Sequence, residues 1–235
     1  MKLNNYKKKI LFLFFLLLVF ASSTKSQNNY YPLEKGYRWE YDMSFKGPLA
    51  TIYSNNLSFV LLNNGKRKVY NKFYFEQEFI MKGRSYCILY KHEEDGLKEY
   101  GKYNPTEPLV SQSQVIYPEP KLMIEYPLRV GATWLEDVET SLIREKFELT
   151  VRCEIISINK TVSVPAGTFK NVLQIYKFGH TSKDLGLLGR AYLQVEYEEW
   201  YALNVGLIKS RSKEVSKQSW IGSGEAEITL YSFSK

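Results

Sequence analysis

Hydrophobic and polar residues alternate along most of the chain after residue 30, with the period of two that is typical of half-buried β-strands. In YRWEYDMSF, Tyr37, Trp39, Tyr41, Met43 and Phe45 lie on one face, opposite four polar or charged side chains. Further strands are predicted where aromatic and β-branched residues concentrate, at 72–80, 85–92, 147–155, 171–178, 191–201, 206–212 and 227–233.

Turn sequences that contain glycine separate several of these strands. NNGK at 63–66 carries Asn-Gly, the strongest short signal for a β-hairpin, and MKGR at 81–84 and EEDG at 93–96 stand at hairpin spacing. We therefore predict one all-β domain, residues 24–235, built as a large curved antiparallel sheet or half-barrel of about ten to twelve strands.

Four prolines, Pro105, Pro108, Pro118 and Pro120, interrupt the alternation between 101 and 123. Proline has no backbone N–H to donate, which excludes it from the central strands of a sheet. We predict that 101–123 is a long connection that crosses between two halves of the sheet.

One motif occurs twice, as YYPLEKGYRWEYD at 30–42 and as EYPLRVGATWLED at 125–137. The residue before proline is held extended and glycine permits a positive φ, so each copy is predicted to start one half of the sheet. A functional alternative treats Asp42 and Asp137 as a carboxylate pair. The matched positions are Tyr31/Tyr126, Pro32/Pro127, Leu33/Leu128, Gly36/Gly131, Trp39/Trp134 and Asp42/Asp137.

The first residues are predicted to be a helical signal peptide. Lysines at positions 2 and 7–9 precede an apolar stretch at 10–20, which is too short to span a bilayer, and small residues follow. Cleavage is expected after Ser23, or after Ser26, which leaves an exported chain without a transmembrane span. Its location is expected to be periplasmic or extracellular.

The charge of the exported chain argues against a nucleic-acid partner. Four of the 32 Lys and Arg residues lie in the leader, so the formal net charge falls from +7 to +3 (7 − 4). A nucleic-acid surface needs a concentrated basic stripe, and the sequence has none.

Two cysteines remain, Cys87 and Cys153. An oxidising compartment permits a disulfide between them, which would contribute about 4 kcal/mol by closing a long loop. The alternative is two free thiols that act as small buried hydrophobes, since alternation places Cys153 on the apolar face of its strand.

The sequence assigns no catalytic, metal-binding or cofactor-binding residue. The two histidines, His92 and His180, stand outside any cluster of metal ligands, and no nucleophile elbow or phosphate-binding loop occurs. Glu196 and Glu198 share one face of a strand, as a glycosidase pair would, but a solvated strand face explains them equally well. We expect a protein that is not an enzyme.

Aromatic residues make up 15% of the chain and supply the candidate binding site. Tyr37, Trp39, Tyr41, Phe73 and Phe75 alternate on two strands expected in one half of the sheet, where they would line a hollow for an apolar ligand. The alternative is that these rings fill the core.

Two segments, VPAGTFKNVLQI at 164–175 and EWYALNVGLIKS at 199–210, carry a resemblance to a known family. Pro165-Ala166-Gly167 fits a three-residue hairpin turn with glycine at positive φ, and Asn204-Val205-Gly206 fits a second tight turn. With the repeated motif, this order resembles secreted, β-rich bacterial proteins of unknown function similar to the pilus-associated protein TapB, and loosely the half-barrels of carriers such as LolA. The resemblance implies a strongly curved antiparallel sheet and no catalytic residue.

Three functions follow as hypotheses for this exported cell-envelope protein. The first is a binding module that holds a lipid or another apolar or amphipathic partner in the hollow of its sheet. The second is a structural or assembly accessory that contacts another envelope protein through strand edges and loops. The third is a hydrolase.

Overall fold

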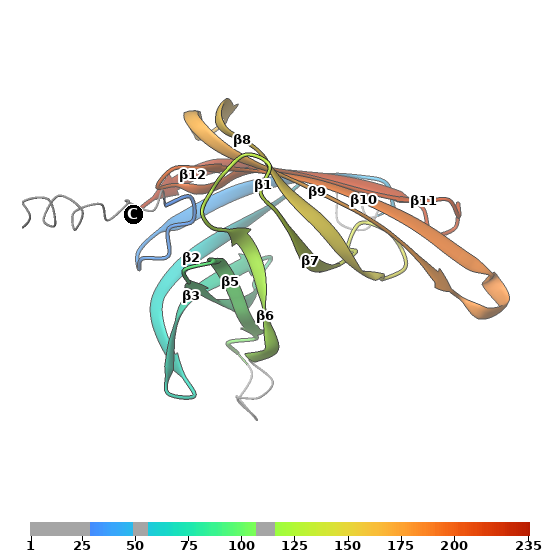
Figure 1. Ribbon diagram of the computed structural model, residues 1–235, viewed down its shortest axis with the longest axis horizontal. Coiled ribbons are helices and arrows are strands. Elements are labelled where there is room, and N and C mark those ends of the chain that lie inside the picture. Colours follow the sequence, from blue (N-terminus) through green and yellow to red (C-terminus); the bar gives the residue numbers. More distant parts are fainter. Residues whose placement is uncertain (1–28, 49–55, 107–115) are drawn as a thin grey trace, which may run out of the picture.

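The computed structural model describes residues 29–48, 56–106 and 116–235, in which nearly all regular structure is β-strand (Figure 1). The predicted signal peptide, 1–23 or 1–26, lies outside the described residues. Within the described ranges, no helix is long and apolar enough to cross a membrane. The strands are β1 (Arg38–Lys46), β2 (Asn56–Val69), β3 (Lys72–Met81), β4 (Arg84–His92), β5 (Gly96–Tyr103), β6 (Ile116–Glu125), β7 (Thr133–Glu139), β8 (Glu148–Val164), β9 (Gly167–Asp184), β10 (Arg190–Ala202), β11 (Gly206–Ser216) and β12 (Ser223–Ser234), with a 3-10 turn, η2 (Gly186–Leu188), between β9 and β10.

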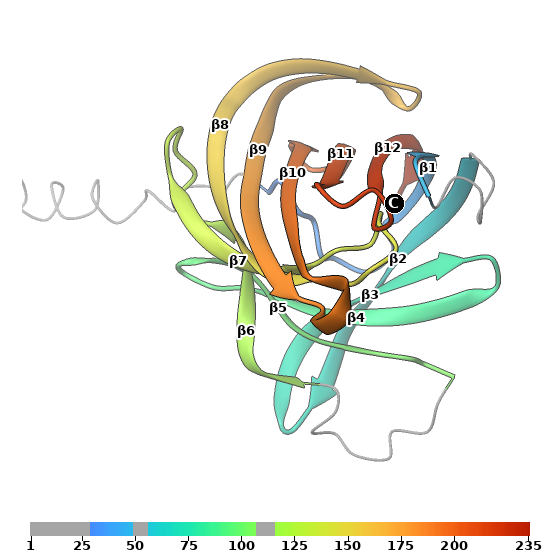
Figure 2. The same cartoon turned by 90° about the vertical axis from the view of Figure 1, so that its right-hand side faces the viewer.

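All twelve strands belong to one antiparallel sheet in the order β6-β5-β4-β3-β2-β1-β12-β11-β10-β9-β8-β7. The last strand, β12, returns to pair with β1. The sheet coils until its edge strands, β6 and β7, come into contact, so that it forms a nearly closed barrel (Figures 1 and 2). The prediction of a large curved all-β sheet is confirmed.

The first copy of the repeated motif ties β1 to β2 through a reciprocal pair of backbone hydrogen bonds. Gly36 N–H donates to Asn63 O (3.1 Å), and Asn63 N–H donates to Tyr37 O (2.9 Å). Gly36 has a φ of 100°, a conformation that glycine adopts readily. This pair sets the register of the β1–β2 ladder from its first residue.

The second copy makes the same pair of bonds between β7 and β8. Gly131 N–H donates to Ile155 O (2.8 Å), Ile155 N–H donates to Ala132 O (3.0 Å), and Gly131 has a φ of 85°. The matched glycines thus perform the same structural task, and each copy precedes a run of six consecutive strands, β1–β6 and β7–β12.

The two motif tryptophans occupy matched buried positions. Trp39 lies opposite Leu61 and is 2% exposed, and Trp134 lies opposite Cys153 and is 7% exposed. Their indole nitrogens differ, because Trp39 Nε1 donates to Val205 O (2.5 Å) whereas Trp134 Nε1 has no partner among the described residues. The motif therefore repeats as packing, but its polar contacts differ between the copies.

Asp42 and Asp137 do not form a carboxylate pair, so that hypothesis is wrong. Both side chains are exposed, and their strands, β1 and β7, stand far apart in the sheet order. Ser58 Oγ donates to Asp42 (3.0 Å) and Thr150 Oγ1 donates to Asp137 (2.6 Å), each from the directly opposed residue of the next strand.

His92, the last residue of β4, connects the two motif copies. Its Nε2 lies 3.0 Å from Tyr31 O, and its Nδ1 lies 3.0 Å from the hydroxyl of Tyr126. A carbonyl oxygen only accepts, so Nε2 carries the proton and Nδ1 accepts from Tyr126. Burial lowers the pKa of His92, which favours this neutral form.

The interior of the barrel is filled largely by the chain's own segments. Leu33 of the first motif copy and Ile143 of the β7–β8 loop are both buried in the main core. Glu214 on β11 holds that loop, because its carboxylate accepts the backbone N–H groups of Ser141 (3.0 Å) and Leu142 (2.8 Å). Burial raises the pKa of Glu214 despite these bonds.

The Asn-Gly sequence at 63–66 is not a hairpin turn, contrary to the prediction. β2 continues through it, and Gly65 lies at a bulge with a φ of 93°. A Cβ atom at Gly65 would lie 3.1 Å from Cβ of Lys35, so glycine serves the close approach of the N-terminal segment. The turn instead falls at Tyr70 and Asn71, which both have positive φ (47° and 63°), as a type I′ turn requires.

The connection predicted at 101–123 is too long, because 101–103 belong to β5 and 116–123 to β6. β6 carries Pro118 and Pro120, but as an edge strand it needs only one ladder and tolerates missing N–H donors. The chain passes between the two halves of the sheet at 126–132, in the second motif copy. Residues 107–115 lie outside the described residues.

The hairpin predicted around Gly167 is present, with a shorter loop. Val164 pairs with Gly167, so two residues, Pro165 and Ala166, form the loop. Gly167 has a φ of 139°, which confirms the expected positive value. Ala166 N–H donates to Leu230 O (3.1 Å) and ties the tip of the hairpin to β12.

Substitution of Gly167 tests this turn. A β-branched side chain strongly disfavours positive φ, so Gly167→Val should lower the free energy of unfolding by about 1–3 kcal/mol. Ala166→Ser, in the same loop at an unstrained residue, should change it by less than about 0.5 kcal/mol. Chemical denaturation of the two variants provides the measurement, and equal midpoints would contradict the assignment.

His92 should make folding stability depend on pH. Its pKa is lowered in the folded state, so the unfolded chain binds the extra proton first as the pH falls below 6.5. Stability is then fully present above that pH and declines below it, by at most about 1.4 kcal/mol per pH unit. His92→Gln should remove this part of the slope between pH 7 and 5, whereas His180→Gln, at an exposed side chain, should keep it. Identical slopes for wild type and His92→Gln would refute the linkage.

Candidate functional site

A cavity of about 180 Å³ lies inside the barrel, between the first motif copy and the two halves of the sheet. Rings of Tyr31, Trp39, Tyr41 and Tyr201 form much of its wall, and Glu199 supplies a carboxylate. The volume is below the roughly 300–1,000 Å³ of sites for drug-sized ligands, but above the engineered cavity of about 150 Å³ that binds benzene. The cavity therefore has room for one compact group.

Strand register places Glu199 on the inner face of β10. It lies opposite Ile175 of β9, which is fully buried, and it shares the inward face of β10 with Val195 and Tyr201. Because side chains alternate across a strand, Glu196 and Glu198 point to the outer face. The carboxylate at the cavity is thus a direct consequence of the alternation in AYLQVEYEEWY.

The amide of Gln77, also at the cavity wall, is already engaged. Tyr31 Oη donates to Gln77 Oε1 (2.8 Å), and Gln77 Nε2 donates to Asn63 Oδ1 (3.0 Å). Asn63 Nδ2 in turn donates to Pro32 O (2.9 Å). This chain of bonds fixes the first motif copy against β2 and β3, and Glu199 is the charged side chain of the cavity wall.

Behind Glu199 lies a buried ionic cluster centred on Lys177 of β9. Lys177 Nζ lies 2.8 Å from Glu136 Oε2 and 3.0 Å from Glu199 Oε1, and only 3% of the lysine side chain is exposed. Tyr201 Oη donates to Glu199 Oε2 (2.7 Å). Cys153 Sγ lies 3.5 Å from Glu136 Oε2. Two carboxylates thus share one ammonium group. Glu99, which has Lys121 and Lys102 near it, also interacts electrostatically with Glu136, so the interior charges extend beyond these three side chains.

Burial and charge act in opposite directions on these groups. Burial lowers the pKa of Lys177, but Glu136 and Glu199 outweigh it, so the lysine pKa is raised and the ammonium form is held. Burial, with the negative charge of Glu199, raises the pKa of the Tyr201 hydroxyl well above its usual range. Both groups therefore stay protonated at neutral pH.

This arrangement suits the binding of a cation. A positive ligand would be attracted by the Glu199 carboxylate, and aromatic faces attract cations through their quadrupoles. Within the described residues, no cluster of three or more His, Cys, Asp or Glu side chains could hold a metal ion.

Of the five aromatic residues proposed from the sequence, Trp39 and Tyr41 line the cavity. Their polar atoms are used by the backbone of the β10–β11 connection and β11: Trp39 Nε1 donates to Val205 O (2.5 Å) and Tyr41 Oη donates to Leu207 O (2.7 Å). Both side chains present only ring surface to the cavity.

The other three proposed residues lie elsewhere. Tyr37 stacks on Trp39, with 5.4 Å between ring centroids, outside the cavity lining. Phe75 packs against the main core. Phe73 is 61% exposed near the tip of the β2–β3 hairpin, so the structure does not bring it to the other rings. The proposed set was too broad, because the alternation in β3 begins in the exposed end of the β2–β3 hairpin, where Phe73 lies.

Cys87 and Cys153 are free, buried thiols, and the disulfide considered from the sequence is not formed. Cys153 faces the interior beside Lys177, which is the directly opposed residue on β9. Cys87 shares the outer face of β4 with Leu89, which packs with Val69 and Tyr74 in a separate small cluster. The two sulfurs therefore lie on opposite faces of the sheet in different halves of the barrel.

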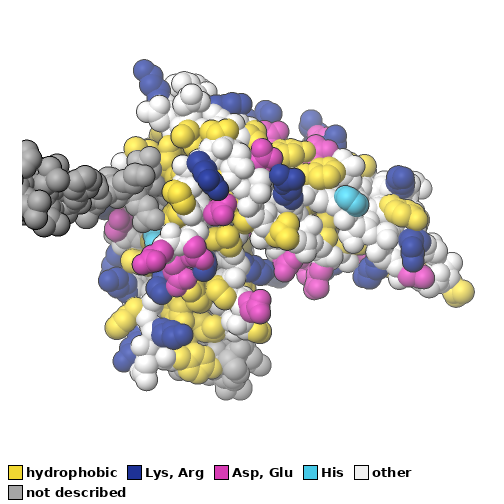
Figure 3. Space-filling model, viewed as in Figure 1, with side chains coloured by type: hydrophobic (Ala, Val, Ile, Leu, Met, Phe, Trp, Pro, Cys, Tyr) yellow, Lys and Arg dark blue, Asp and Glu magenta, His cyan; other side chains and the backbone are white. Residues whose placement is uncertain are grey.

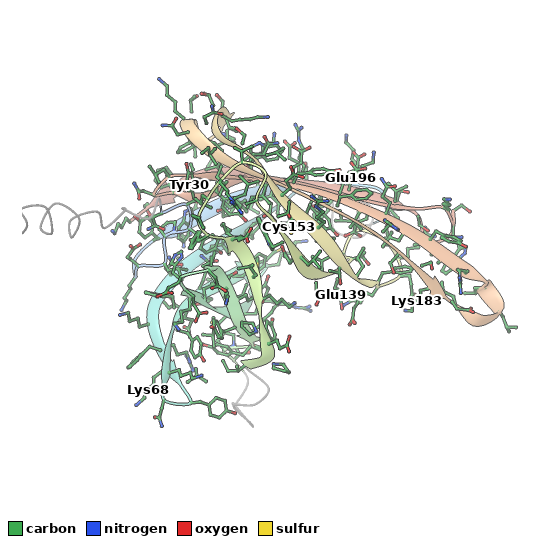
Figure 4. The ribbon with its side chains drawn as sticks, viewed as in Figure 1. Tyr30, Lys68, Glu139, Cys153, Lys183 and Glu196 are labelled. Atoms are coloured by element: carbon green, nitrogen blue, oxygen red, sulfur yellow. The ribbon has the colours of Figure 1, made fainter. Side chains whose placement is uncertain are left out.

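A larger groove, about 490 Å³, lies on the outer face of β10, β11, β12 and β1 and contains Glu196 and Glu198. Gln194 Nε2 donates to Glu196 (2.8 Å), and Gln174 Nε2 donates to Glu198 (2.8 Å). Figure 4 shows Glu196 along the upper side of the sheet. Arg211 also lies in the groove and bonds to Glu227 (2.6 Å). Burial acts to raise the pKa of Glu227, but Arg211 and Lys209 outweigh it, so the pKa is lowered.

Lys177, Glu136 and Glu199 were not singled out in the sequence, although a signal for two of them was present. Lys177 follows Leu173 and Ile175 on the apolar face of its strand, and Glu199 follows Leu193 and Val195 in the same way. A charged residue at an inward position is expected only if it is paired. Their meeting with Glu136 depends on how β7, β8 and β9 align, which local sequence does not reveal.

Removal of Lys177 should be severely destabilising. Lys177→Met leaves the buried Glu136 and the half-buried Glu199 carboxylates without their cation, and breaking a buried ion pair in this way costs about 3–5 kcal/mol. Lys183→Met, which breaks the partly exposed pair with Glu145 (3.2 Å), should cost about 0–1 kcal/mol. Unfolding in urea compares the two, and adding Glu136→Gln to Lys177→Met should restore part of the loss. A small effect of Lys177→Met on the free energy of unfolding would contradict the prediction, because it would mean that water solvates the two carboxylates.

Comparison with known proteins yields no matching family model and no matching curated protein. Two similar solved structures are a Bacteroides fragilis protein, proposed to be exported and described as having a YmcC-like fold, and a Parabacteroides distasonis protein proposed to be a lipoprotein. The first has 11% identity and a TM-score of 0.45, and the second has 13% identity and a TM-score of 0.38. Each likeness covers 87% of this chain and 98% of the other. The resemblance to TapB or LolA is not shown by these comparisons.

Proposed function

We propose that this is an exported, non-catalytic binding protein that holds a small organic cation in its interior cavity. The single observation behind the proposal is the Glu199 carboxylate, which faces a space walled by aromatic rings. The ligand class is an amine or quaternary ammonium compound with a short apolar body. This narrows the apolar or amphipathic partner expected from the sequence.

Charge supports a cation over a neutral or anionic ligand. The Glu199 carboxylate lines the cavity and shares its ammonium partner, Lys177, with Glu136, so an anion entering the cavity would be repelled at short range. Inside a protein such repulsion is screened less than in water. A cation would instead be attracted to the Glu199 carboxylate.

Size supports a compact ligand over a lipid. A cavity of about 180 Å³ is smaller than the usual site for a drug-sized molecule. Leu33 of the motif segment and Ile143 of the β7–β8 loop are packed in the main core and so also occupy interior space. A long acyl chain is therefore the less favoured occupant of this cavity.

The assembly role through strand edges has weaker support than cation binding. The edge strand β6 carries Pro118, Pro120 and Lys121, which are features that discourage pairing with a further strand. The hydrolase hypothesis requires a carboxyl group free to exchange protons with a substrate, and the outer-face glutamates are instead held by Gln174, Gln194 and neighbouring cations.

Calorimetric titration with tetramethylammonium, choline and the neutral isostere of choline, in which carbon replaces nitrogen, tests the proposal. Both cations should bind and the isostere should not, because only the charge differs. Trp39 lines the cavity, so its fluorescence should change on binding. Glu199→Gln should weaken binding by at least about tenfold, while Lys177 keeps Glu136 as its partner and the fold is maintained.

Glu196→Gln is the matched control. It removes the same charge from the same strand on the outer face, so binding should stay at the wild-type level. Equal binding of choline and its neutral isostere, or equal losses in the two variants, would contradict recognition of a cation by Glu199.

A further inference from the structure

The connection between β9 and β10 carries two leucines in full contact with water. Leu187 is fully exposed and Leu188 is 65% exposed. The connection forms the free end of a long hairpin at one extremity of the molecule, opposite the C-terminus (Figure 1). Apolar side chains with Lys or Arg beside them are visible at this end in Figure 3. We call it the distal tip, residues 185–189.

The distal tip is an ordered turn. Leu185 N–H donates to Gly189 O (2.9 Å), and Gly189 N–H donates to Gly186 O (2.9 Å). Gly186 N–H also donates to Asp184 Oδ1 (2.9 Å), and both glycines have positive φ, 64° and 77°. The backbone therefore holds the two leucines outward, although burial of such side chains is strongly favourable.

A second turn, between β11 and β12, adds aromatic residues beside the hairpin. Gln218 Nε2 donates to Arg190 O (2.9 Å), and Gln218 Oε1 accepts from Tyr192 N–H (3.0 Å). The same turn carries Trp220, which is 38% exposed, while Tyr192 is 46% exposed. Tyrosine and tryptophan favour the boundary between apolar and aqueous phases.

Positive charge predominates around these apolar groups. Lys217 Nζ lies 5.5 Å from the Tyr192 ring centroid, and neither Lys217 nor Arg190 has a carboxylate partner among the described residues. Lys183, near the same end in Figure 4, pairs with Glu145 (3.2 Å). Arg144 donates to Trp220 O (3.1 Å). The four cationic side chains named here thus outnumber the two nearby carboxylates, those of Asp184 and Glu145.

We propose that the distal tip docks on the surface of a lipid bilayer that contains anionic headgroups. Leu187 and Leu188 enter the interfacial layer, Tyr192 and Trp220 lie at the headgroup level, and Arg190 and Lys217 meet the anionic lipids. Apolar insertion combined with basic residues is the general mode of reversible membrane-surface binding. This property is independent of the interior cavity.

A bilayer fits the tip better than a protein partner does. Stable protein interfaces bury about 1,200–2,000 Å², whereas the tip presents two exposed leucines at the narrow free end of a hairpin (Figure 1). A narrow apolar projection with cations behind it requires no complementary pocket in a fluid bilayer.

The test uses the exported chain from Thr24 onward, because the apolar leader would itself bind membranes. Vesicles of phosphatidylcholine with phosphatidylglycerol, and of phosphatidylcholine alone, are separated by flotation. Wild-type protein should float with the mixed vesicles. Trp220 should be quenched by brominated acyl chains, because the other three tryptophans are at most 7% exposed. Trp220→Phe should remove the quenching but not the flotation.

Leu187→Glu combined with Leu188→Glu should reduce flotation by at least about tenfold. Leu135→Glu is the matched control, since Leu135 is 68% exposed on β7, away from the tip, and should leave binding unchanged. Arg190→Glu combined with Lys217→Glu should abolish the preference for phosphatidylglycerol.

Failure of the wild-type protein to float, or equal flotation of the double leucine variant, would overturn the proposal. Sedimentation velocity without vesicles tests whether the distal tip instead binds a second copy of the chain. A monomer in both wild type and variant is expected, and a wild-type dimer that the leucine substitutions dissociate would also overturn it.

Discussion

The reciprocal backbone pair made by each motif glycine is the constraint on which the barrel depends. Gly36 with Asn63, and Gly131 with Ile155, fix the register of the first ladder in each half. A slip of one residue would turn every side chain of a strand to the other face. The later strands of each half pair in sequence from these two ladders, so the pair determines which residues reach the interior. The motif is thus structural in both copies, and His92 joins the copies through Tyr31 and Tyr126.

Sequence reasoning succeeded where the determinant is local and failed where it is a contact between distant segments. Alternation located the strands, and the positive φ of Gly167 followed from its turn sequence. The Asn-Gly at 64–65 wrongly predicted a hairpin turn, because this glycine instead accommodates the close approach of Lys35, thirty residues away. Phe73 and Phe75 were grouped with Trp39 by alternation alone, yet β3 runs out of the barrel at Phe73. The inward position of Glu199 was readable from its strand, whereas its pairing with Lys177 requires the alignment of β9 with β10.

The buried cluster of Lys177, Glu136 and Glu199 is difficult to explain by stability. Replacing a buried ion pair with hydrophobic residues of similar volume is often neutral or stabilising, so three ionised groups in the core are not needed to hold the barrel together. Their position is the informative feature, because Glu199 shares its ammonium partner, Lys177, with Glu136 and also reaches an open space. Glu199 is the member at the cavity wall.

The small volume of the interior cavity also limits what the protein could do at a membrane. A carrier that extracts a lipid must enclose an acyl chain, and a cavity of about 180 Å³ that is walled by Tyr31, Tyr41 and Tyr201 has no such room. Docking through Leu187 and Leu188 therefore positions the protein at a bilayer without moving lipid into the barrel. The two features lie at different positions along the β9–β10 hairpin, since Glu199 and Tyr201 reach the cavity near the end of β10, whereas the distal tip is the turn between the two strands. A substitution at either one should leave the other intact, because no described contact joins them.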